Sequence, residues 1–150
     1  MTRKQFIALT VTVAALAAAV TAAWAVDANA RKEQAASGGY RIEVTDGGSV
    51  LRSFTSAELA KLPKRRVAMQ GQPQEGPSVL SVLKAAGVKR FNTVTVVGQG
   101  VRDDGRLVLK RAAIDEDVLL DFAVRGTAKV CGPDIAWEDR VRDVERLEVR

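Results

Sequence analysis

The feature that most constrains the fold is a period-of-two alternation of apolar and polar residues in short segments after residue 39. Residues 40–44 and 118–124 show this alternation most clearly. Such a period is typical of β-strands that bury one face. The chain does not alternate strand-like and helix-like segments in the way that builds a parallel sheet. The sequence therefore predicts an α+β domain with a mixed or barrel-like sheet.

Other short segments complete the expected sheet. Further strands are predicted over residues 49–53, 67–70, 93–97, 107–109 and 129–131, with a closing strand through Val144, Leu147 and Val149. Turns are expected at residues 46–48 and 103–105, where glycine follows aspartate. The Gly/Gln/Pro-rich residues 71–77 are expected to form a loop. The alternating charges of residues 138–150 predict paired surface groups on an edge strand.

Two short helices are expected. The first begins at Thr55, because Glu58 three residues later completes a capping box, and Phe54 and Leu59 are spaced as a hydrophobic staple. Pro63 ends it.

The second helix is predicted from Ser78 to Ala86, with Pro77 near its first turn and Gly87 just after its last. The residues of its buried face share helical spacing: Val79, Val82, Leu83 and Ala86.

The amino-terminal residues have the pattern of an export segment. Arg3 and Lys4 precede an uncharged, mainly apolar run from Phe6 to Val26, followed by small-residue cleavage sites. The run is also long enough to cross a bilayer, so residues 6–26 are either a cleaved signal or an anchor in the membrane. We divide the chain into a signal or anchor (1–30), a linker (31–39) and a folded domain (40–150), and expect the domain to be extracytoplasmic.

The composition excludes several kinds of site. The chain has no histidine and one cysteine, Cys131. Ser-His-Asp catalysis, histidine-based zinc sites and intramolecular disulfides are therefore excluded. The net charge of +5 is dispersed and aromatic residues make up only 5%, so no nucleic-acid partner is expected.

Four segments in order resemble the molybdopterin-binding domain of sulfite-oxidase-type oxidoreductases. They are "SFTSAELAKLP", "EGPSVLSVLKAAGV", "RLVLKRAAIDEDVLLDFAVRG" and "DRVRDVERLEV", and the likeness extends from Tyr40 to Arg150. The resemblance implies a molybdopterin-binding α+β fold. It also implies a molybdenum-binding cysteine thiolate before the second helix, but here residues 67–76 contain no cysteine, and Met69 offers only a neutral thioether.

Few side chains remain as candidates for a site. Arg65 and Arg66, beside Lys64, form a basic cluster that is either a solvated surface or an anion site, and Arg102 has the same two interpretations. Cys131 is interpreted as a small buried side chain or, alternatively, as a redox or cofactor-binding thiol. No metal ligand and no catalytic residue is assigned. Trp137 is either a core residue or a lid over a groove, and residues 115–117 are expected to form a solvated acidic turn.

Two functional hypotheses follow. In the first, the domain is non-catalytic, holds no cofactor, and uses its cleft to bind a small anionic ligand or a partner protein. In the second, it is an active molybdopterin-dependent oxidoreductase or a subunit that receives the cofactor. A Cys131 side chain at the mouth of an arginine-lined crevice would favour the second hypothesis.

Overall fold

The computed structural model describes residues 39–69, 71–100 and 103–150. The predicted signal or anchor, most of the linker and Arg102 lie outside these residues. Within them the fold is mixed α+β, as the alternation predicted, and consists mainly of strands.

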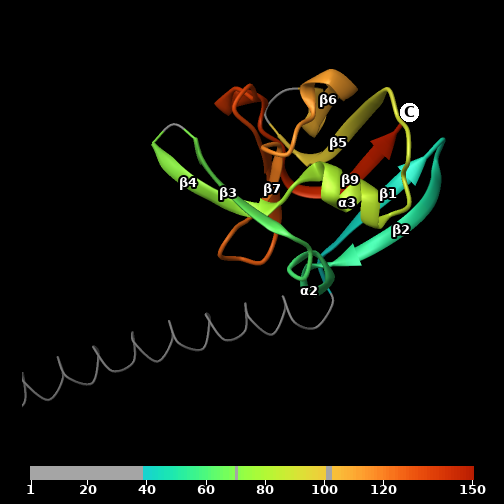
Figure 1. Ribbon diagram of the computed structural model, residues 1–150, viewed down its shortest axis with the longest axis horizontal. Coiled ribbons are helices and arrows are strands. Elements are labelled where there is room, and N and C mark those ends of the chain that lie inside the picture. The colour runs from blue at the N-terminus through green and yellow to red at the C-terminus, as the bar shows by residue number, and fades with distance from the viewer. Residues whose placement is uncertain (1–38, 70, 101–102) are drawn as a thin grey trace, which may run out of the picture. The chain divides into compact units, whose positions relative to one another are not determined.

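The main element is a five-stranded sheet with the strand order β2-β1-β9-β5-β6 (Figure 1). Its strands are β1 (Arg41–Asp46), β2 (Ser49–Thr55), β5 (Thr93–Gln99), β6 (Arg106–Lys110) and β9 (Arg142–Val149). Neighbours pair antiparallel except β1 and β9, which run parallel. Among the described residues β2 and β6 have one partner each, so the sheet is open and the barrel-like prediction is wrong.

The prediction that the closing strand lies at an edge is also wrong, because β9 lies between β1 and β5. Val144, Leu147 and Val149 are buried on this strand, and β1 and β5 lie along its two edges. The charges between them are paired, as predicted: Arg106 and Arg146 both contact the carboxylate of Glu148, at 2.6 and 3.0 Å.

Two hairpins extend from the sheet. β3 (Lys64–Met69) pairs with β4 (Gln72–Pro77), and β7 (Leu119–Phe122) pairs with β8 (Ala128–Cys131). The expected loop at residues 71–77 is therefore mostly a strand. Gly76 explains its position, since a Cβ there would lie 1.9 Å from the carbonyl oxygen of Leu120. Only glycine lets β4 approach β7 so closely.

The alternation over residues 118–124 does not describe one buried face. Val118, Leu119 and Leu120 are all buried, whereas Val124 is fully exposed in the turn between β7 and β8. The segment has cover on both sides, so consecutive residues are buried where a half-buried strand would alternate.

Both helices form near the predicted positions. α2 (Ser56–Leu59) has the predicted capping box, with the Thr55 hydroxyl accepting from the Glu58 backbone and the Glu58 carboxylate accepting from the Thr55 backbone. α3 (Val79–Ala85) begins after Ser78, whose hydroxyl accepts from the Ser81 backbone.

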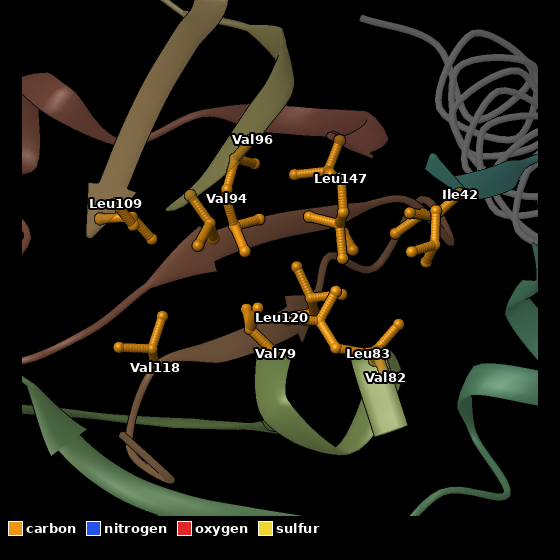
Figure 2. Packing of buried hydrophobic residues seen from close by; sticks show 14 of the residues in the cluster. Ile42, Val79, Val82, Leu83, Val94, Val96, Leu109, Val118, Leu120 and Leu147 are labelled. Atoms are coloured by element: carbon orange, nitrogen blue, oxygen red, sulfur yellow. The ribbon is translucent and has the colours of Figure 1, made fainter. Parts of the chain in front are cut away.

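The core lies between the sheet and the layer formed by α3 and β7 (Figure 2). Ile42, Val94, Val96, Leu109 and Leu147 come from the sheet. Val79, Val82, Leu83, Val118 and Leu120 face them from α3, β7 and the residue before β7. Burial of these aliphatic side chains is the main stabilising contribution in a domain with few aromatic residues.

Tyr40 connects the beginning of β1 to two distant strands. Its hydroxyl donates to the carbonyl of Val144 on β9 and accepts from the backbone N–H of Ala128 on β8, at 3.0 Å. Burial is the main cause that raises the pKa of this hydroxyl from 10.0 to about 12. The neutral phenol is therefore the form that the fold requires.

Replacing this hydroxyl tests the connection. Tyr40→Phe leaves the Ala128 N–H and the Val144 carbonyl without this partner, and we expect it to lower the free energy of unfolding by about 1–3 kcal/mol. Urea denaturation at neutral pH measures the loss.

The alkaline pH dependence supplies the second readout. Because the folded pKa is raised, the Tyr40 contribution is complete below pH 10 and is lost as the pH rises towards about 12. The difference in stability between wild type and Tyr40→Phe should shrink over that interval. A difference that stays constant from neutral pH to pH 12 would contradict the role assigned to the hydroxyl.

Candidate functional site

A cavity of about 240 Å³ lies where β8 approaches the chain that leads into β9. It is lined by Lys129 of β8, Trp137 and Glu138 of the short helix η3 (Trp137–Asp139), Arg140, and Arg142 at the start of β9. We call this cavity the Arg140 groove. Its lining contains three cationic side chains, one acidic side chain and one large aromatic ring.

Arg140 is the unusual member of this set. The residue is only 9% exposed, although an arginine is seldom buried without a partner. Its guanidinium lies over the Trp137 ring, with the Cζ atom 4.6 Å from the ring centroid. Its Nε is buried and has no hydrogen-bond partner among the described residues. A donor in this state favours the binding of an acceptor, and most strongly of an anion.

The backbone fixes the position of Arg140. The Val130 N–H donates to the carbonyl of Val141 at 2.9 Å, which joins β8 to the residue next to Arg140. The Arg140 N–H donates to the carbonyl of Trp137 at 3.4 Å, so ring and guanidinium belong to one turn. Ile135 is buried just before this segment, and its N–H donates to the carbonyl of Gly132 at 3.2 Å. The stacked pair is thus held in place before any ligand arrives.

Trp137 is 67% exposed and lines the groove, so of its two interpretations the structure favours the lid over the core residue.

The two cations of the groove other than Arg140 differ in their surroundings. Lys129 forms an ion pair with Asp121 at 3.1 Å, and Arg142 is exposed at the rim. Among the described residues, Arg140 and Arg142 form no ion pair, so an anion can contact them without breaking one.

Cys131 is fully buried and does not line the groove. Its thiol lies 3.8 Å from the carbonyl oxygen of Leu119 and packs in a small cluster with Leu119 and Met69. Burial is the main cause that raises the pKa of the thiol from 9.0 to about 11, although Lys129 and Arg140 act in the opposite direction. The residue matches the description of a small buried side chain.

The chemistry of these donors does not fit a molybdenum–thiolate centre. Such a metal needs an accessible, anionic sulfur, whereas Cys131 is the only cysteine in the sequence and is held as a buried thiol. Met69, the other sulfur named as a candidate, is 5% exposed and belongs to the same cluster. We therefore derive no step through such a cofactor.

The basic cluster predicted on β3 is not part of the groove. Arg65 forms an ion pair with Asp117 at 3.1 Å. Arg66 is exposed and lies opposite Glu75 in the β3–β4 hairpin. Neither lines the Arg140 groove, and Arg102 lies outside the described residues. The structure therefore does not gather the arginine candidates into one site.

The acidic residues 115–117 form a turn, as predicted. The Asp115 carboxylate accepts from the Asp117 backbone, and Glu116 accepts from the Ser78 hydroxyl, both at 2.9 Å. In residues 39–69, 71–100 and 103–150 no group of three acidic, cysteine or histidine side chains is placed to hold a metal ion.

The residues that form the groove were not identified as one site from the sequence. Arg140 and Lys129 carry no periodic signal, and charged residues near the chain end usually face solvent. The only local indication was an aromatic residue followed closely by two arginines, at residues 137–142.

No helix of the described residues is long and apolar enough to span a bilayer.

No protein-family model matches the sequence, and no curated protein matches it significantly. A solved structure is similar in fold: a chain in the crystal structure of the sulfane dehydrogenase SoxCD from Paracoccus pantotrophus, with a TM-score of 0.58 and 18% identity. The similar region covers 75% of the present chain and 38% of that chain. The described domain therefore shares its fold, in part, with a portion of that dehydrogenase.

Proposed function

We propose that this chain is a non-catalytic binding module of the sulfite-oxidase-type molybdopterin-binding fold, and that the Arg140 groove binds a small anionic ligand. The observation that carries the proposal is the Arg140 side chain, which is 9% exposed, has a buried and unpaired Nε, and lines a cavity beside an exposed indole ring. A buried charge without an ion pair is costly for folding. A bound anion would offset that cost by accepting from the unpaired Nε.

The size of the groove limits the ligand. At about 240 Å³ it is smaller than the roughly 300 Å³ at which ordinary drug-sized ligand pockets begin. The cations favour a phosphate, sulfate or carboxylate group, and the exposed face of Trp137 favours a small planar group attached to it.

The groove residues supply binding groups and lack the usual groups for catalysis. The chain has no histidine to transfer protons near neutral pH. The thiol of Cys131 is buried, with its pKa raised to about 11. The likeness to the sulfane dehydrogenase is one of fold alone, so the preference for a binding role over an active molybdopterin oxidoreductase rests on the donors of this chain.

We also propose that the domain is exported. The support is the basic amino terminus followed by the uncharged run from Phe6 to Val26. A fusion of residues 1–39 to a reporter enzyme active only outside the cytoplasm should give activity in intact cells. The same fusion with charged residues replacing part of the run should be silent, and equal activity from both would remove the proposal.

Removing the Arg140 charge tests the groove. We expect Arg140→Met to weaken the binding of phenyl phosphate to the full chain by at least about thirtyfold, since loss of a buried charge partner costs about 2 kcal/mol or more. The same variant should raise the free energy of unfolding by about 1 kcal/mol, because an apolar side chain of similar volume replaces an unpaired buried charge. Calorimetric titration and urea denaturation measure the two effects.

The matched control is Arg66→Met, which removes an exposed arginine on β3 and should change neither quantity. Wild type should prefer phenyl phosphate to inorganic phosphate, and Trp137→Ala should abolish that preference. Equal phenyl phosphate affinity in wild type and Arg140→Met would refute the proposed site.

The thiol gives an independent test of the non-catalytic assignment. Native protein at neutral pH should resist iodoacetamide and react only after unfolding in urea, because the Cys131 thiol is buried and protonated. Cys131→Ala should retain phenyl phosphate affinity while losing on the order of 1 kcal/mol of stability.

Metal content separates the two functional hypotheses directly. The full chain purified from a host that makes molybdopterin should contain molybdenum only at background level. Near-stoichiometric molybdenum would overturn the non-catalytic assignment in favour of the alternative, and rapid alkylation of the native thiol would contradict the burial of Cys131 on which that assignment depends.

A further inference from the structure

A second groove lies at the carboxyl end of α3, built from elements other than those of the Arg140 groove. Its volume is about 560 Å³. Leu80, Leu83, Val88 and Phe91 form its apolar floor. Lys84, Lys89, Arg90 and Arg111 form its rim. We call it the α3 groove.

The rim is entirely cationic. Among the residues that line the groove, none is acidic. Lys84, Lys89 and Arg90 are exposed, and within the described part of the chain none of them forms an ion pair. Four positive charges around one opening create a local potential that attracts acidic groups.

The floor is apolar and recessed. Leu83 is 1% exposed, and Leu80, Val88 and Phe91 are half-buried against the core. Arg111 lies over the Phe91 ring, with its Cζ 5.2 Å from the ring centroid, and donates to the carbonyl of Ile114 at 2.9 Å. The floor can therefore accept an inserted aliphatic side chain, with Arg111 held beside it by its contacts to Phe91 and Ile114.

Backbone contacts hold the groove in shape. Just after α3 the chain reverses at Gly87, whose φ is +86°, and the Val88 N–H donates to the Leu83 carbonyl at 3.0 Å. On the opposite side the Arg111 N–H donates to the Asn92 carbonyl at 2.8 Å. A preformed groove reduces the entropy that a ligand's binding must overcome.

We propose that the α3 groove docks an acidic segment of a partner protein, with aliphatic side chains of that segment on the floor and its carboxylates on the rim. Charge complementarity identifies the occupant. A nucleic-acid strand would need exposed aromatic faces for stacking, but the only aromatic ring here, Phe91, is covered by Arg111. A membrane would need apolar side chains that protrude, whereas these are recessed.

The test uses the full chain and a fluorescein-labelled peptide of repeating Glu-Leu-Asp units. We expect binding at low ionic strength that weakens as salt is added, because exposed charges are screened. Lys89→Glu combined with Arg90→Glu should weaken it about tenfold or more, since two favourable contacts of up to about 1 kcal/mol each become repulsive. Leu80→Ser should weaken binding at high salt as well as at low salt.

The control variant is Lys64→Glu combined with Arg66→Glu, which makes the same change in net charge on β3 and should bind the peptide nearly as wild type does. Peptides with lysine replacing the acids, or serine replacing leucine, should not bind.

Absence of binding by the acidic peptide, or unchanged binding in the Lys89/Arg90 variant, would overturn the proposal. Binding to phosphatidylserine vesicles in preference to the peptide would overturn it in favour of a membrane surface. Phenyl phosphate affinity should be unchanged in the Lys89/Arg90 variant, so this outcome is separate from that of the Arg140 groove.

Discussion

The pairing of β9 between β1 and β5 is the constraint on which the other elements depend. Leu147 lies opposite Val44 on one side and Val96 on the other, and all three are fully buried. This row joins the first described strand to the last and provides the surface that α3 and β7 cover (Figure 2). Because the two strands of the β1–β9 pair are far apart in sequence, their pairing is non-local and carries the loop-closure entropy of the intervening chain.

The position of the Arg140 groove follows from the same strand. Arg140 is two residues before β9, and the hydrogen bond from Val130 to Val141 sets the approach of β8. The sheet therefore fixes where the guanidinium lies, and the short turn at Trp137 fixes what it stacks on. An arginine held in this way decreases folding stability and provides a preorganised donor, a combination that is typical of binding sites.

The two grooves differ in chemistry. The Arg140 groove is small, has one deeply buried cation and carries an exposed indole, which suits a compact anion. The α3 groove is larger, with exposed cations around an aliphatic floor, which suits an extended acidic segment. The two proposed binding roles rest on these lining residues and require neither a histidine, which the chain lacks, nor the buried Cys131 thiol.

Local signals predicted the local elements. The capping box at Thr55 and Glu58 located the first helix, and Pro77, Gly87 and the helical spacing of apolar residues located the second, because these signals depend on residues a few positions apart. The strands around the aspartate-glycine turns were located for the same reason. The strand at residues 72–77 was missed because proline and glycine usually mark loops, and only the close approach of Gly76 to Leu120 shows why they are required there.

From the sequence alone follow the α+β class, the capping box at Thr55 and Glu58, the lack of histidine, and the lack of a cysteine in residues 67–76 before α3. The tertiary structure alone decided that β9 is central, that the sheet is open, and that Arg140 is buried against Trp137 while Arg65 and Arg66 face elsewhere. The physical reason is the range of the interactions. Capping and turn formation depend on residues a few positions apart, whereas strand order and the burial of a charge depend on which distant segments supply the surrounding surface.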